Sequence, residues 1–174
     1  HMKLQKSLDA FLFCCYAGMR YSDFTNLSKK NIVDINQETW LIYKSVKTGT
    51  EVRLPLYLLF AGKGIVILNK YRNNLEDFFR LRDNSNINKD LIIIAKLAGL
   101  SKKISFHTAR HTNATLLIYN GVNITTVQKL LGHKSVKTTQ VYTNIMDMTI
   151  VHDLEKIKQA ALGIKKKTDN SFNK

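Results

Sequence analysis

The chain has 174 residues, which is enough for one domain with a sizeable hydrophobic core. Hydrophobic residues make up 44% of the chain and charged residues 23%, proportions that are typical of a folded globular protein and exclude a mainly disordered one. The formal net charge is +14 at pH 7, and so basic a domain most often binds a polyanion, nucleic acid more commonly than an anionic membrane surface.

The two ends of the chain differ from the part between them. His1 and Met2 resemble the remnant of a cleaved tag, and a helical pattern follows at once, without a secretory signal. Residues 163–174 are polar and basic, which predicts a disordered tail. We therefore expect one domain over residues 3–162. No apolar run approaches the ~18 residues that a membrane-spanning helix needs, so no membrane segment is expected.

Two helices open the predicted fold. Apolar residues recur at helical spacing from Leu4 to Cys15, and Gly18 is the expected end of this first helix. Cys14 and Cys15 are adjacent in it and so point in different directions, which predicts small core residues in a reduced, cytoplasmic protein and no disulfide. A short second helix is expected over residues 21–27.

Three short strands are expected next. Residues 32–35, 39–46 and 51–54 are rich in β-branched and aromatic side chains. Between the last two lies Lys47-Thr48-Gly49-Thr50, a tight hairpin in which the glycine supplies the unusual backbone angle, and Pro55 closes the last strand. These segments predict a small antiparallel sheet.

The rest of the chain predicts helices. They are expected over residues 57–72, 88–98, 107–120, 124–131, 136–142 and 148–162, with a loop or frayed helix over residues 78–86. Gly99, Gly121 and Gly132 are the expected ends of three of them. The sequence as a whole predicts an α+β fold, a mainly α-helical domain with a small antiparallel β-sheet of about three strands on one side.

Histidines, an arginine and a tyrosine form a pattern in the helical half. His107, Arg110 and His111 fall on one face of a helix by the i, i+3, i+4 rule. His133 follows Leu131 and Gly132 directly, and Tyr142 comes soon after it. Together with an arginine near the first helix and a lysine in the hairpin, this set suits attack on a phosphodiester without a metal.

Each of these residue types can perform one task in phosphoryl transfer. Arg20 and Arg110 can each bind phosphate oxygens with a charged fork, and a histidine can donate to the same oxygens or move a proton near neutral pH. A tyrosine hydroxyl, with a pKa of ~10, is a poor nucleophile alone, and we expect the cationic cluster to lower the pKa of Tyr142. The departing 5′ oxygen needs a proton, which Lys47 on a mobile hairpin could deliver.

The order of these motifs resembles the catalytic domain of the tyrosine recombinases, also called phage-type integrases, from about Leu8 to Asn144. Gly18-x-Arg20-x-x-Asp23 resembles the family's first arginine box, and Lys47 in a hairpin resembles its lysine. His107-x-x-Arg110, Leu131-Gly132-His133 and Tyr142 complete the set in the family's order.

The resemblance implies roles for particular residues. The implied catalytic set is Arg20, Lys47, His107, Arg110, His133 and Tyr142, with Asp23 bracing the first arginine. Tyr142 would attack a DNA phosphate, forming a 3′-phosphotyrosyl link and freeing a 5′ hydroxyl, while the two arginines clamp the phosphate. Lys47 would be the general acid, His133 would hydrogen-bond the phosphate, and His107 would act as acid/base or phosphate contact. Neither metal, ATP nor any other cofactor would be needed.

The resemblance also implies partners. The substrate would be double-stranded DNA, on which four protomers exchange strands through a Holliday junction. The segment from Met148 to Leu162 would dock on a neighbouring protomer to form this tetramer. Family members usually carry an N-terminal DNA-binding domain, so the chain would be an isolated catalytic domain of a bacterial, phage or mobile-element protein that acts in the cytoplasm.

Three other interpretations compete with this one. The segment from Ile124 to Tyr142 could be a helix-turn-helix, with Gly132 at the turn, in a non-catalytic DNA-binding module. A relaxing topoisomerase would share the tyrosine chemistry. A zinc site at His107 and His111 is disfavoured because the metalloprotease motif needs Glu where Thr108 stands and no third ligand is evident, so His111 is interpreted mainly as a structural helix residue.

Overall fold

The structure, a computed structural model, describes residues 2–143, 154–155 and 157–158. In chain order its elements are α1 (Met2–Ala17), α2 (Tyr21–Thr25), η1 (Lys29–Asn31), β1 (Ile32–Ile35), β2 (Glu38–Lys44), β3 (Glu51–Pro55), η2 (Leu59–Gly62), α3 (Lys63–Lys70), α4 (Leu75–Phe79), α5 (Asn84–Leu97), α6 (Phe106–Tyr119), α7 (Ile124–Leu131) and α8 (Lys137–Gln140). The predicted α+β class, mainly helical with three antiparallel strands, is confirmed. No helix in the described ranges is long and apolar enough to cross a membrane.

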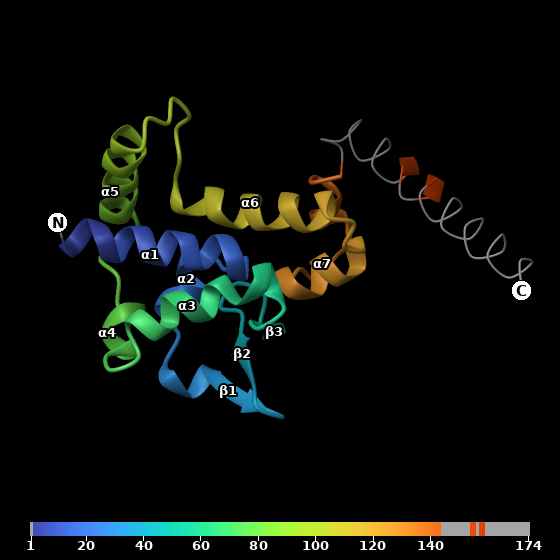
Figure 1. Cartoon of the computed structure of the whole chain (residues 1–174), viewed down its shortest axis with the longest axis horizontal. Coiled ribbons are helices and arrows are strands. Elements are labelled where there is room, and N and C mark those ends of the chain that lie inside the picture. The colour runs from blue at the N-terminus through green and yellow to red at the C-terminus, as the bar shows by residue number, and fades with distance from the viewer. Residues whose placement is uncertain (1, 144–153, 156, 159–174) are drawn as a thin grey trace, which may run out of the picture.

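Helix α1 is the centre of the helical layer. It packs against α3, α5 and α6, and Figure 1 shows α6 running alongside it with the sheet on the other side. Its buried side chains include Phe13, Cys14 and Cys15, which confirms the predicted core position of the two cysteines. Because α1 ends at Ala17, the turn that leads to Arg20 lies where α6 and α7 also meet the core.

The sheet has the order β1-β2-β3 and supports the hairpin that was predicted around Lys47. Leu41 and Tyr43 of β2 face the core together with Val52 and Leu54 of β3, as expected for strands with one buried face. The connecting turn is closed by two backbone bonds of Ser45: its N–H donates to the Thr50 carbonyl, and its carbonyl accepts from the Gly49 N–H, both at 2.8 Å.

Two predicted helices have different bounds in the structure. The helix predicted over residues 57–72 is wrong in its first part, because Phe60 and Ala61 adopt positive φ angles of 49° and 54° in η2 and only α3 continues as a regular helix. The segment 78–86, predicted as a loop or frayed helix, contains the end of α4 at Phe79 and the start of α5 at Asn84. The Asp83 side chain accepts a hydrogen bond from the Asn86 N–H and so caps that helix.

Two predictions concern residues beyond the well-described part of the chain. The proposed docking segment from Met148 to Leu162 lies outside the described residues except for four helical positions, 154, 155, 157 and 158. The tail predicted over residues 163–174, and the tag remnant at His1, lie outside them as well.

Candidate active site

Arg110 is buried, at 2% exposure, although it is charged. It lies in α6 and reaches two helix ends: Nη1 donates to the Gly18 carbonyl at 2.7 Å, and Nη2 donates to the Leu131 carbonyl at 2.6 Å. Burial, and then repulsion from Arg20, lowers the pKa of Arg110 to about 10, so the side chain stays cationic at pH 7. Since an arginine has five N–H donors, these two bonds fix the guanidinium and leave donors for a ligand.

Asp23, buried in α2, connects Arg20 to the start of the Lys47 hairpin. Its carboxylate accepts from the Val46 N–H at 2.8 Å and from the Ser45 hydroxyl at 3.3 Å. Arg20 Nη1 lies 3.5 Å from the same carboxylate and donates to Ser45 Oγ at 3.1 Å. The arginine and the hairpin are therefore held by one buried carboxylate.

Lys47 is exposed at the tip of the turn, and the turn is also attached on its other side. There the Thr48 hydroxyl donates to the Gly132 carbonyl at 3.1 Å. Gly132 ends α7 with a φ of +62°, and His133 follows it. The hairpin therefore contacts both the Arg20 region and the turn that carries His133.

His133 is 8% exposed, and its Nδ1 lies 2.9 Å from the Thr139 hydroxyl. Burial, and then the positive charges of Arg110 and Arg20, lower the pKa of His133 to about 4. The imidazole is therefore neutral at pH 7. In the tautomer in which the Thr139 hydroxyl donates to Nδ1, the proton of the ring is on Nε2 and can be donated to a ligand.

Two exposed histidines of α6, His107 and His111, form consecutive ring contacts that end at Tyr142. The rings of His107 and His111 have centroids 4.4 Å apart, and the His111 ring lies 5.3 Å from the Tyr142 ring. Partial burial, and then His111, Arg110, Arg20 and Lys47, lower the pKa of His107. His111 is thus an exposed neighbour of the tyrosine, whereas the sequence analysis interpreted it mainly as a structural helix residue.

Tyr142 is buried, and the prediction about its pKa is wrong in its net direction. Arg110 and Arg20 do act to lower the pKa of Tyr142, as expected from their charge. Burial of the phenol has a larger effect in the opposite direction, so the pKa of Tyr142 is raised. In this structure the tyrosine is therefore a protonated phenol at neutral pH.

The structure thus brings all the predicted site residues into one region. Arg20, Lys47, Asp23, His107, Arg110, His133 and Tyr142 are connected through the contacts and charge interactions above. Sequence analysis did not identify Ser45, Thr48 and Thr139 as neighbours of this site, because single hydroxyl residues without a motif carry no signal. Within the described residues, no group of three or more His, Cys, Asp or Glu side chains could hold a metal ion.

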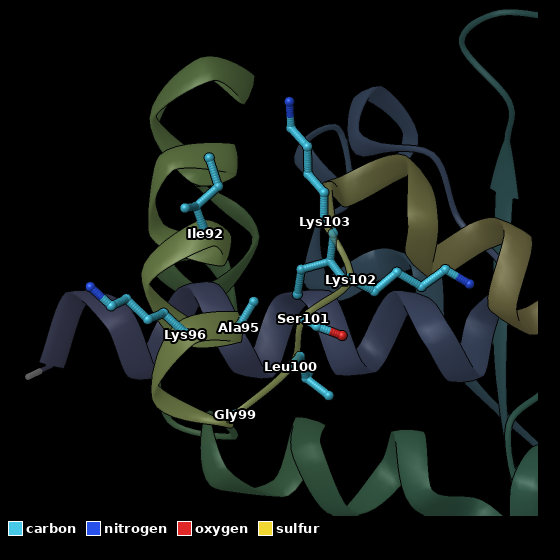
Figure 2. A pocket seen from close by; sticks show the side chains of 9 residues that line it. Ile92, Ala95, Lys96, Gly99, Leu100, Ser101, Lys102 and Lys103 are labelled. Atoms are coloured by element: carbon cyan, nitrogen blue, oxygen red, sulfur yellow. The ribbon is translucent and has the colours of Figure 1, made fainter.

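Surface hollows in the described part of the chain differ in whether they include residues of the candidate site. One, of about 560 Å³, includes His133 and is lined by the exposed cations Arg53, Lys129 and Lys134 and by Glu51, which is ion-paired with Arg53 at 3.3 Å. Lys129 and Lys134 therefore extend the positive surface outward from the site. Another, of about 480 Å³, lies between α5 and the loop that follows it (Figure 2) and contains none of the predicted site residues. The lysine side chains at its rim extend in different directions, so they form no converging cation site.

The helix-turn-helix interpretation is disfavoured by the dimensions of its second helix. α8 has only four residues, whereas a recognition helix must reach into the major groove. Gly132 and His133 at the turn are buried against the hairpin. The segment from Ile124 to Tyr142 is therefore built into the domain and positions a histidine and a tyrosine.

Comparisons with known proteins identify relatives across most of the chain. A sequence model described as the Phage integrase family matches residues 5–148. The tyrosine recombinase XerC of Rickettsia prowazekii is 30% identical over 159 residues, covering 86% of this chain and 49% of that protein. The tyrosine recombinase XerA of Saccharolobus solfataricus is 34% identical over 134 residues, covering 74% and 42%. The chain spans about half the length of these curated relatives.

Solved structures show the same fold. A crystal structure of XerA recombinase has a TM-score of 0.66 at 25% identity, covering 87% of this chain and 62% of that chain. The XerH site-specific recombinase, solved with a palindromic difH substrate as a post-cleavage complex, has a TM-score of 0.63 at 21% identity, covering 91% and 52%.

Proposed function

The chain belongs to the phage integrase family of tyrosine recombinases, and from this premise we propose that it is a catalytic domain, over residues 3–162, that cleaves and rejoins double-stranded DNA. The observation behind the proposal is a cluster of charges around Tyr142. Arg20 and Arg110 act to lower the pKa of Tyr142, and the same two arginines interact with His133, which is neutral. Such a cluster fits a phosphodiester, which offers one negative charge and two non-bridging oxygens.

The phosphate would be bound by three donors. Arg110 is held rigidly by the Gly18 and Leu131 carbonyls, and Arg20 is held by Asp23, so both guanidinium groups are pre-organised before the ligand arrives. His133 would donate its Nε2–H to a non-bridging oxygen. Pre-organised donors stabilise the charge of the pentacoordinate phosphorus without reorganisation during the reaction.

Cleavage would then exchange one ester bond for another. The Tyr142 oxygen forms a bond to phosphorus as the bond from phosphorus to the 5′ oxygen breaks, leaving a 3′-phosphotyrosyl link. The phenolic proton passes to His107, which is neutral because its pKa is lowered, and the Lys47 ammonium supplies a proton to the departing 5′ oxygen. Rejoining reverses both transfers. The phosphodiester energy is conserved in the link, so the reaction requires neither metal nor ATP.

Strand exchange would need further partners. The XerH comparison carries a DNA substrate, and the basic surface at Lys129 and Lys134 fits a DNA backbone next to the site. The chain covers 49% of its XerC relative, so a longer parent chain could also hold the N-terminal DNA-binding domain that the family resemblance implies. Four protomers would associate through the segment from Met148 to Leu162, in which Leu154 and Ile157 are exposed, and would act on DNA in the bacterial cytoplasm.

A covalent-trapping assay tests the proposal. The chain and its full-length parent are each offered a nicked suicide duplex with the ends of the source element, denatured, and resolved by size. We expect a shifted protein–DNA band that Tyr142→Phe abolishes. Tyr57→Phe removes the same hydroxyl from a half-buried tyrosine beside Trp40 and should leave the band unchanged. If neither the chain nor its parent forms an adduct, or if Tyr142→Phe retains it, the proposal is overturned.

A further inference from the structure

The hairpin from Ser45 to Thr50 touches both halves of the candidate site. On one side, Ser45 is 1% exposed, accepts a hydrogen bond from Arg20 and donates one to Asp23. Its backbone N–H and carbonyl close the turn itself. This side of the hairpin is therefore fixed to the Arg20 region by buried bonds that form part of the fold.

The other side of the hairpin is attached to the Gly132 turn by the side chain of Thr48. The Thr48 hydroxyl donates to the Gly132 carbonyl at 3.1 Å, across 84 positions of sequence, and accepts from the Thr50 N–H at 3.4 Å. Thr48 is half-buried, so water can compete for this bond. Between Thr48 and the buried Ser45 lies exposed Lys47, whose position therefore depends on both attachments.

The surface that receives Thr48 is shaped for close contact. A Cβ atom at Gly132 would lie 2.6 Å from Val52 Cγ2 of β3 and 3.9 Å from Ser45 Cβ. The Gly132 turn therefore lies flat against the hairpin strands, and its carbonyl can reach the Thr48 hydroxyl. Because His133 is the next residue, this bond joins the loop that carries Lys47 to the loop that carries His133.

We propose that Thr48 is a positioning residue, whose hydroxyl holds the hairpin against the Gly132 turn so that the Lys47 ammonium can reach the 5′ leaving oxygen. The inference rests on the proposed function. A single neutral hydrogen bond is worth about 0.5–1.5 kcal/mol, which corresponds to a loss of roughly two- to twelvefold in the population of the docked hairpin. Cleavage that depends on Lys47 should slow by the same factor.

The test separates proton delivery from all other steps. Single-turnover cleavage is measured with a natural suicide duplex and with one in which sulfur replaces the bridging 5′ oxygen at the scissile phosphate. A thiolate leaves without a proton because thiols are far more acidic than alcohols (~8.5 for a cysteine thiol), so this duplex bypasses the general acid. The variants are Thr48→Val, which removes the hydroxyl at nearly constant shape, Thr48→Ser, which keeps it, and Thr50→Val as a matched change in the same hairpin.

We expect Thr48→Val to slow cleavage of the natural duplex roughly two- to twelvefold and to cleave the sulfur duplex at the wild-type rate. Thr48→Ser and Thr50→Val should match the wild type on both. Equal slowing on the two duplexes, no slowing on either, or a Thr48→Ser variant as slow as Thr48→Val would each overturn the inference. A wild-type chain and parent that cleave neither duplex would instead overturn the proposed function, and the inference with it.

Discussion

Gly18 is the position at which the fold and the candidate site are most closely linked. Its φ is +68°, in the left-handed region, and its carbonyl accepts the hydrogen bond from Arg110. A Cβ atom at this position would lie 2.6 Å from Asn113 Oδ1 and 2.8 Å from Leu131 Cδ2. The Asn113 amide cannot move aside freely, because its Nδ2 donates to the Cys15 and Tyr16 carbonyls.

The cost of Gly18→Ala can be worked out from these contacts. A non-glycine residue in the left-handed region costs about 1–2 kcal/mol, and overpacking of a buried site costs about 1–3 kcal/mol more. Gly99 has the same φ of +68° with nothing within 4 Å of an added Cβ, so Gly99→Ala carries the first cost alone. The two substitutions should therefore differ by about 1–3 kcal/mol in the free energy of unfolding.

Thermal unfolding of the two variants and the wild type measures this difference. At about 2–4 °C per kcal/mol for a chain of this size, Gly18→Ala should melt about 2–12 °C below Gly99→Ala. Gly18→Ala should also lower the yield of covalent adduct at a temperature where it is still folded, since it displaces the carbonyl that fixes Arg110. Equal melting temperatures for the two variants would refute the steric argument, and unchanged adduct formation would refute the link to Arg110.

Two predictions concern pH. Because the pKa of His133 is lowered to about 4, the unfolded chain binds more protons than the folded one between about pH 6.5 and pH 4, so stability falls as the pH falls. From pH 7 to pH 5.5 the free energy of unfolding, measured in urea, should fall by at most about 1 kcal/mol for this reason. The His133→Gln variant should not show this fall. The same pH dependence in the variant would contradict the role given to His133. The single-turnover cleavage rate should fall only below about pH 6.5, where His107 gains a proton, and should not keep rising toward pH 10. A rate that climbs to pH 10 would indicate a phenolate nucleophile instead.

Local sequence signals predicted the parts of the fold that local chemistry determines. The Lys47 hairpin follows from its glycine, and α7 has the predicted bounds, residues 124–131, and ends at Gly132. The η2 turn could not be predicted in this way, because Phe60 adopts a positive φ without being a glycine. Its ring packs on the Tyr16 ring at 5.8 Å, a tertiary contact that overrides the local preference.

Motif spacing predicted which residues form the candidate site, but it could not predict which of them contact one another. The bond from Thr48 to Gly132 spans 84 positions and exists only after α7 has packed beside β3. The direction of the pKa shift at Tyr142 likewise depends on burial, which a pattern of charges does not contain. Charge alone predicts activation of the tyrosine, whereas charge and burial together predict a protonated phenol.

Because Tyr142 is a protonated phenol at neutral pH, the proposed reaction must remove its proton during cleavage and not before it. When a phosphodiester anion enters between Arg20 and Arg110, its charge offsets part of the positive charge that acts to lower the pKa of Tyr142. Burial and substrate would therefore act in the same direction on the pKa of Tyr142, so in the proposed reaction the phenolic proton leaves as the bond to phosphorus forms. The proposed reaction therefore requires a neutral base. Partial burial, and then His111, Arg110 and Arg20, lower the pKa of His107, so this histidine is neutral at pH 7 and fits that role.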